Sequence, residues 1–150
     1  MKIDSNVLAK FQMLGSRIVS LYLKNDSISS SVICLGKKNL DISHEIVSAE
    51  LQENAFLGVI RLHVNVKVKQ EKTSYILKLV LEGGFSAPKE MSEEVFKKML
   101  SINGIASLYG IARAHICSIS SQSFTDGSVI LPMIDVTRYS KVLSSDDSKV

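Results

Sequence analysis

Hydrophobic and polar residues alternate along the first half of the chain. Apolar residues or glycine occupy every second position of residues 56–68, and the intervening positions become more polar toward the end of that segment. Successive side chains of a strand point to opposite faces of a sheet, so this pattern predicts a strand with one buried face. Residues 75–81 repeat the alternation, and weaker patterns in 17–24 and 40–51 predict two further strands. Short polar connections between the last three strands favour an antiparallel meander.

The pattern changes to a helical period after these strands. Ser92 is a typical N-cap residue, and Glu93 and Glu94 after it suit the positive end of a helix dipole. We expect this helix to break or kink at Asn103-Gly104 before a longer helix continues.

A short helix is expected to close the chain. Residues 129–134 are predicted to be extended around Pro132, and Asp135 can cap the helix that follows. Strands followed by helices predict an α+β fold, with the helices on one face of a four-stranded antiparallel sheet. Because the 150 residues show no internal repeat, we expect a single domain over residues 1–143 and a short polar tail over 144–150.

The long predicted helix, residues 105–121, carries two stripes of different character. Apolar residues recur at spacings of three and four and share one helix face: Ile105, Leu108, Ala112, Ile116 and Ile119. A second stripe contains only small residues: Ala106, Gly110, Ala114, Cys117 and Ser121. Glycine costs about 1 kcal/mol relative to alanine inside a helix, so Gly110 indicates a compensating contact. We interpret the small stripe as an oligomer interface, with packing on the chain's own sheet as the alternative.

Charge and cysteine content argue against several classes of function. The formal net charge is +3, and the lysines within residues 67–72 are not interleaved with aromatic residues, so we expect no nucleic-acid partner. Cys34 and Cys117 lie far apart and form no metal-ligand spacing. The longest uncharged run, residues 99–112, is shorter than the roughly 20 apolar residues that cross a bilayer. No export signal is visible, and we expect a cytoplasmic protein that does not insert into a membrane.

The sequence contains no familiar enzyme motif. We expect His63 to be solvated on the polar face of its strand and His115 to be structural. Glu82 lies directly before Gly83-Gly84, and a glycine pair in this position usually indicates a bulge or a close approach of another segment. We therefore do not expect an enzyme.

Several segments together resemble the SecB family of protein-export chaperones. Residues 108–113, 115–119 and 131–136 look like that family's aromatic-rich helix, its apolar continuation and its closing proline-containing segment. Residues 56–64 look like the family's third strand, and residues 83–86 are similar to the end of its fourth strand. The matches follow the family's order from residue 17 to about residue 143.

The resemblance implies a fold, an assembly and a function. The fold is a four-stranded antiparallel sheet backed by a long kinked helix, and the assembly is a dimer of dimers with helices at the tetramer interface. The function is that of a holdase chaperone, which binds unfolded polypeptides in apolar grooves without nucleotide, metal or other cofactor. By match to the family's groove elements, the expected client-binding residues are Leu21, Tyr22, Leu23, Phe85, Tyr109, Met133, Val136 and Tyr139. Ordinary core packing is the alternative for each of them.

The chain also departs from the family pattern. Typical members are acidic and offer carboxylates to the SecA motor, whereas the net charge here is positive and Leu79 matches an acidic contact position. Gly110 and Ile111 replace the proline and tyrosine of the family's helix motif. These departures argue against SecA as a partner and favour a dedicated client such as an antitoxin, beside a general role in export. The alternative from another class is a hotdog-like small enzyme or ligand-binding protein.

Overall fold

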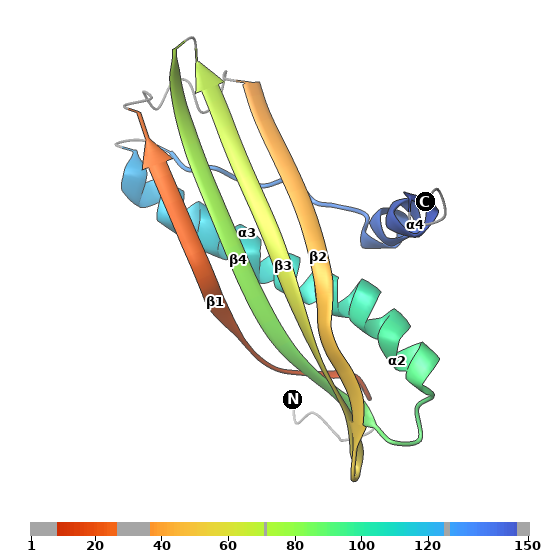
Figure 1. Cartoon of the computed structure of the whole chain (residues 1–150). Coiled ribbons are helices and arrows are strands. Elements are labelled where there is room, and N and C mark those ends of the chain that lie inside the picture. Colours follow the sequence, from red (N-terminus) through yellow and green to blue (C-terminus); the bar gives the residue numbers. More distant parts are fainter. Residues whose placement is uncertain (1–8, 27–36, 71, 125–126, 147–150) are drawn as a thin grey trace, which may run out of the picture.

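The structure is a computed structural model of the chain, and it describes residues 9–26, 37–70, 72–124 and 127–146. One antiparallel sheet contains the strands β1 (Gln12–Asn25), β2 (Lys37–Gln52), β3 (Ala55–Gln70) and β4 (Thr73–Pro88). Their order in the sheet is β1-β4-β3-β2, as Figure 1 shows. The predicted four-stranded antiparallel sheet is confirmed, and so is the meander of the last three strands. The first strand lies beside the fourth at one edge of the sheet, and β2 forms the other edge.

The helical part of the chain begins where it was predicted. The Ser92 hydroxyl accepts a hydrogen bond from the Val95 N–H at 3.3 Å and caps the helix α2 (Glu93–Met99). A π-helical turn η2 (Leu100–Gly104) follows, and the helix α3 (Ile105–Ser123) continues directly from it. The predicted break is thus a change of helix type within one long run. A Cβ at Gly104 would lie 2.7 Å from Cδ1 of Ile60, so any larger residue there would require this buried side chain to shift.

The last helix, α4 (Val136–Asp146), follows an extended segment and lies beyond the β2 edge in Figure 1. Its cap is the predicted one, because the Asp135 carboxylate accepts a hydrogen bond from the Arg138 N–H at 3.0 Å. The helix runs past residue 143, where we expected the domain to end. Some predicted features lie outside the described part of the chain. They are the side chains of Val142 and Leu143, residues 147–150, Cys34 and most of the loop predicted after β1.

The core lies between α3 and one face of the sheet, which we call the inner face (Figure 1). Four residues of the predicted apolar stripe, Ile105, Leu108, Ala112 and Ile116, are fully buried, and Ile119 packs at the margin. Every second residue of β3 from Phe56 to Val68 is buried against the helix, as the alternation predicted. We call the opposite face of the sheet the outer face, and no described element crosses it (Figure 1).

The glycine pair in β4 marks a close approach of α3 to the sheet. A Cβ at Gly83 would lie 2.7 Å from Cδ2 of Leu108, whereas a Cβ at Gly84 would approach only Leu14, at 3.9 Å. The two glycines therefore differ, because Gly83 faces the helix and Gly84 faces outward. The strand itself continues to Pro88.

Candidate functional site

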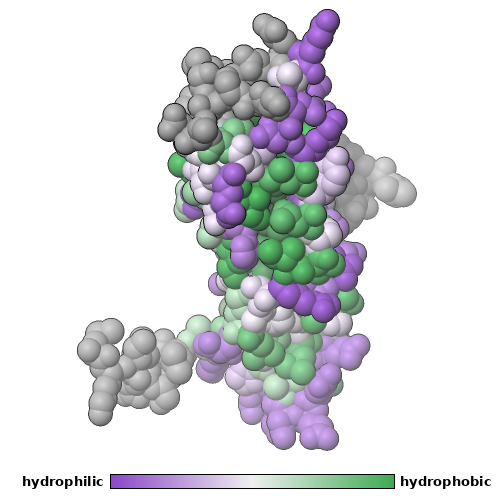
Figure 2. All heavy atoms as spheres, turned by 90° about the vertical axis from the view of Figure 1, so that its left-hand side faces the viewer, coloured by the Kyte–Doolittle hydropathy of each residue, from purple (hydrophilic) through white to green (hydrophobic). Residues whose placement is uncertain are grey.

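The edge strand β1 exposes a large apolar surface. Figure 2 views the molecule from the side on which β1 lies in Figure 1, and hydrophobic residues gather along it. The large exposed hydrophobic residues of this strand are Leu14, Ile18, Val19, Leu21, Tyr22 and Leu23, which range from 38% exposure at Leu23 to 64% at Leu14. We call these residues the β1 patch. Contiguous apolar surface of this kind usually marks an interaction site. The free side of an edge strand adds backbone N–H and C=O groups that have no partner strand.

The register of β1 on β4 separates three residues predicted to bind a client. Leu21 and Leu23 pair with residues of β4 that are fully buried on the inner face. Tyr22 pairs with Lys78 and lies on the outer face, where Nζ of Lys78 is 5.9 Å from the centre of the tyrosine ring. Leu21 and Leu23 thus share the inner side of β1 with Ile18, whereas Tyr22 belongs to the other face.

Two other predicted client-binding residues lie in the core. Phe85 is 1% exposed, and its ring stacks on Phe11 with the ring centres 5.2 Å apart. Tyr109 is buried between α3 and the segment before α4, and this burial raises the pKa of its hydroxyl. The alternative of ordinary core packing is what the structure shows for both. Neither side chain offers surface to a client in this arrangement, because α3 and its neighbours cover them.

The segment of residues 127–135 is held along α3 by side chains of that helix. Three hydrogen bonds link them: from the Val129 N–H to Ser120 Oγ (2.7 Å), from Arg113 Nε to Leu131 O (3.0 Å) and from Tyr109 Oη to Pro132 O (2.8 Å). Sequence analysis did not identify Arg113 and Ser120 as anchors. Arg113 follows Tyr109 by four residues and Ser120 follows Arg113 by seven, a spacing that places all three on one helix side and could have indicated the role.

The same segment presents apolar side chains to solvent. Val129 and Leu131 are buried, whereas Ile130 is 69% and Met133 is 79% exposed. This alternation is typical of an extended segment with one side on the protein. Met133 was predicted to bind a client, and its accessibility suits that role. Ile130 was missed, although its position between two buried residues of an apolar run could have revealed it.

The helix α4 is anchored to β2 through Tyr139. The Tyr139 hydroxyl donates a hydrogen bond to the Ile42 carbonyl at 3.3 Å and lies 3.2 Å from Nδ1 of His44. Partial burial lowers the pKa of His44 and raises the pKa of Tyr139. Tyr139 and Val136 pack against the core and remain partly accessible, so each can still present a part of its side chain to a client.

The stripe of small residues on α3 faces away from the sheet. Ala106, Gly110, Ala114 and Ser121 are exposed, and Cys117 is half-buried with Sγ 3.4 Å from Ser128 Oγ. A Cβ at Gly110 would meet no atom within 4 Å, so no described neighbour requires a glycine there. The described part of a single chain therefore offers no contact that compensates for this helical glycine. The oligomer interface stays a prediction, and the exposure of this stripe leaves it free to contact a second helix.

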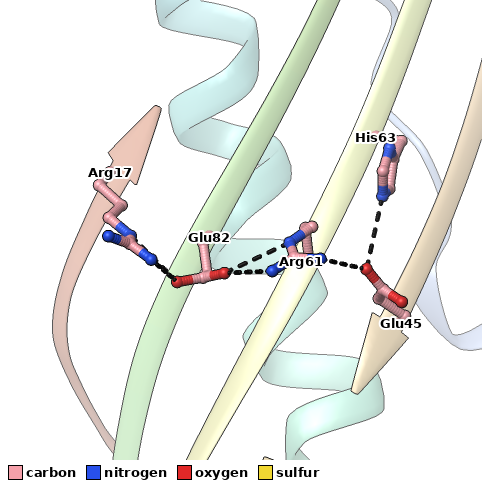
Figure 3. Close-up of polar contacts among 5 residues, drawn as sticks. All are labelled: Arg17, Glu45, Arg61, His63 and Glu82. Carbon is pink, nitrogen blue, oxygen red and sulfur yellow. Dashed lines mark hydrogen bonds and ion pairs between the residues drawn. The ribbon is translucent and has the colours of Figure 1, made fainter. Parts of the chain in front are cut away.

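A row of alternating charges crosses the outer face of the sheet (Figure 3). Glu82 of β4 accepts hydrogen bonds from Arg17 of β1 at 2.7 Å and from Arg61 of β3 at 2.9 Å, and Arg61 also reaches Glu45 of β2 at 2.8 Å. The hydrogen bonds from Arg61 and then Arg17 lower the pKa of Glu82. Next to this row, Nε2 of His63 lies 3.8 Å from the Glu45 carboxylate. Both glutamates are thus engaged by arginines of the same chain.

The position of Leu79 corrects one expectation drawn from the SecB family. Leu79 is fully buried on the inner face, so it cannot take the place of an acidic contact on the outer face. Glu82 lies on the outer face, in the row described above. The argument against SecA docking therefore rests on the neutralisation of Glu82 and on the positive net charge.

Within residues 9–26, 37–70, 72–124 and 127–146, no three His, Cys, Asp or Glu side chains are grouped to hold a metal ion. No helix in this described part is long and apolar enough to span a bilayer.

Comparisons with known proteins find similarity in structure only. No family model matches the chain, and no curated protein matches its sequence. The fold is similar to the Rv1957 SecB-like chaperone of Mycobacterium tuberculosis, solved in complex with a ChAD peptide from the Rv1956 HigA1 antitoxin. The match has a TM-score of 0.64 and 11% identity, and it covers 84% of this chain and 88% of that one. A protein of unknown function from Streptococcus agalactiae matches with a TM-score of 0.49 and 10% identity, over 82% of this chain and 97% of that one. The resemblance found in the sequence is thus confirmed as a SecB-like fold.

Proposed function

We propose that this chain is a SecB-like holdase chaperone that binds non-native polypeptides. The observation that carries this proposal is the β1 patch, which places exposed apolar side chains along an edge strand that pairs with a described strand on one side only. A holdase must bind many extended sequences, so it needs adaptable apolar surface and free backbone groups rather than a shaped catalytic pocket. The SecB-like fold supports the proposal.

The client-binding surface that we propose has a main part and an additional part. The main part is the inner side of β1, with Ile18, Leu21 and Leu23. The additional part is the accessible surface of Met133 and Ile130, beside the partly exposed Val136 and Tyr139. Apolar burial contributes roughly 25 cal/mol per Å² whatever the client sequence. A surface of this kind therefore gains affinity without strong sequence selectivity.

We further propose that the functional form is a homo-oligomer, organised as a dimer of dimers. The small-residue stripe on α3 supports this, because it is exposed in the single chain and would let the backbone of a second helix come close. The hotdog-like alternative is not favoured by any feature of the site, because in Figure 1 α3 lies across one face of an open sheet that does not wrap around it.

We propose a dedicated client such as an antitoxin, in the cytoplasm, ahead of a general role in protein export. The Mycobacterium tuberculosis protein of similar fold was solved with a peptide from an antitoxin, which makes this client class a natural first candidate. SecA is not among the partners we propose, because arginines of the chain itself neutralise Glu82.

The direct test is a refolding assay without nucleotide. A slow-folding secretory protein and an unstable antitoxin are each refolded with and without the chain. We expect refolding of at least one of them to be arrested at a near-stoichiometric amount of tetramer. Unchanged refolding of both, together with a strictly monomeric native mass, would contradict the proposed function.

A further inference from the structure

One end of the outer sheet face carries a group of lysines that the strand register brings together. Lys67 and Lys69 of β3 share the outer face, because Val66 and Val68, which alternate with them, are buried on the inner face. Lys67 pairs with Ile76 of β4, and Ile76 pairs in turn with Lys24 of β1, so the three residues form one row across the sheet. Lys78 of β4 lies in the next row. We call Lys24, Lys67, Lys69 and Lys78 the basic end.

The charge of the basic end is largely uncompensated within the described part of the chain. Lys24 forms an ion pair with Asp26 at 3.4 Å. Among the described residues, Lys67, Lys69 and Lys78 form no ion pair. The glutamates of the charge row in Figure 3 are already engaged by Arg17 and Arg61. One further carboxylate, Asp41 of β2, lies on this face in the row of Asn65 and Lys78, so the lysines still outnumber the acidic side chains near them. Lysines close together on one sheet face repel each other, and an anionic partner would remove that repulsion.

The basic end also offers flat apolar surface between its charges. Ile76 and Val80 of β4 are half-buried on the outer face, among the lysines. Tyr22 of β1 lies beside them, and Lys78 is positioned over its ring. No described element covers this face of the sheet, so the lysines and these apolar side chains are presented together.

We propose that the basic end is a docking surface for an extended acidic polypeptide segment of a partner protein. Alternate residues of an extended chain point to the same side and lie about 6.6 Å apart, which is the repeat of Lys67 and Lys69 along β3. Carboxylates at every second position would thus meet these lysines in succession. A nucleic acid is the weaker fit, because the group contains no arginine and its single tyrosine is already in contact with Lys78.

This docking surface shares Tyr22 with the β1 patch and otherwise lies apart from the proposed client-binding surface. Leu21 and Leu23 lie on the inner side of β1, whereas the basic end lies on the outer face. An acidic partner could therefore dock while a client is held. Failure of the refolding assay would not affect this proposal, and failure of acidic docking would leave the holdase proposal intact.

The test measures binding of a labelled peptide of alternating Glu and Ser to the full chain. A peptide with Gln in place of Glu and a single-stranded oligodeoxynucleotide serve as competing probes. The variant Lys67→Glu/Lys69→Glu/Lys78→Glu is compared with Lys10→Glu/Lys89→Glu/Lys98→Glu, which changes the net charge equally at exposed positions elsewhere. Circular dichroism and native mass verify that both variants keep the fold and assembly.

We expect the acidic peptide to bind at low salt and to be released as salt screens the lysines. The basic-end variant should lose about tenfold in affinity, since each exposed pair contributes about two- to threefold. The control variant should stay within about twofold. Equal losses in both variants would overturn the proposal in favour of net charge alone. Absence of peptide binding would overturn it, and so would tighter oligonucleotide binding that depends on the same lysines.

Discussion

The two edge strands of the sheet, β1 and β2, differ in how their side chains are covered. Beside β2, the helix α4 is anchored through the hydrogen bond from Tyr139 to the Ile42 carbonyl. Exposed apolar residues of β2 are confined to its second half, at Ile46, Val47 and Leu51. Large apolar residues of β1 are exposed over most of its length and on both faces, and no described element covers them. Because natural proteins usually protect apolar edge strands, the difference indicates that β1 is the edge that binds another molecule.

The largest effect is expected from charges placed on the inner side of β1. The variant Leu21→Asp/Leu23→Asp should weaken client binding at least about tenfold, because each leucine loses part of the roughly 1.5–3 kcal/mol that its full burial contributes. Binding of an unfolded client, followed by fluorescence anisotropy, measures this change. The fold should persist, since both side chains are exposed in the free chain.

The matched control for this prediction lies on the other edge. Ile46→Asp/Leu51→Asp introduces the same charge at exposed inward-facing positions of β2. We expect client affinity close to that of the unmodified chain. Equal weakening by the two double variants would show that the edges do not differ in function.

The second prediction concerns assembly, because contacts between subunits determine which surfaces stay exposed to a client beside the β1 patch. Gly110→Leu should dissociate the proposed tetramer into dimers, because a large side chain in the small-residue stripe would keep two helices apart. The subunit itself should not lose stability, since no atom lies within 4 Å of a Cβ at this position. Native mass spectrometry reads the assembly, and an unchanged tetramer mass would place the stripe outside the interface.

The third prediction tests the contact between α3 and the middle of the sheet, on which the positions of both edges depend. Gly83→Val should lower the free energy of unfolding by about 1–3 kcal/mol, because its Cβ would overlap the packed Leu108 side chain. Gly84→Val is the matched control and should change stability much less, since the nearest neighbour of a Cβ at Gly84 is 3.9 Å away. Chemical denaturation measures both variants, and a larger loss in Gly84→Val would reverse our assignment of the two glycines to the sheet faces.

The fourth prediction concerns the hydrogen bond that anchors α4 to β2. Tyr139→Phe keeps the ring and removes the hydroxyl that donates to the Ile42 carbonyl, at a cost of about 1 kcal/mol. Amide hydrogen exchange in α4 should accelerate by about fivefold, while exchange in β3 stays unchanged. Unaltered exchange in α4 would mean that this hydrogen bond does not hold the helix.

The smallest effect is a pH dependence that arises from His44 beside Tyr139. Burial lowers the pKa of His44 in the folded state, so the unfolded chain takes up a proton at higher pH than the native chain. This contribution to stability is complete above the unfolded pKa of about 6.5 and is lost as the pH falls from there through the folded pKa. Denaturation midpoints at several pH values should show the loss, and His44→Gln should reduce it.

Local patterns in the sequence predicted the sheet faces and the buried stripe of α3, because these depend on strand and helix periods alone. The alternation in β4 also places Leu79 with Leu77 and Leu81 on the buried face, and it was a more reliable guide than the family match. The pairing of β1 with β4 could not be predicted, since it depends on a connection between distant residues. It is this pairing that brings Lys24 beside Lys67 and Lys78.

The candidate site was harder to predict than the fold. Phe85 and Tyr109 carry the aromatic character of a binding surface, but they are covered by elements whose position a sequence pattern does not give. Leu21 and Leu23 are accessible because α3 and its neighbours leave the inner side of the edge strand partly open. The exposure of an apolar side chain thus depends on which helices and strands pack over it, and this is a property of the complete fold.

Photo-crosslinking decides most directly whether the β1 edge holds non-native polypeptide. A photoreactive phenylalanine analogue is placed at Leu21 in one protein and at Leu51 in another, both exposed inward-facing positions on opposite edges. Each protein is irradiated with an unfolded client in the absence of nucleotide. We predict client crosslinks from position 21 and few from position 51. Crosslinks from position 51 alone, or equal yields from both, would contradict the assignment of client binding to the β1 edge.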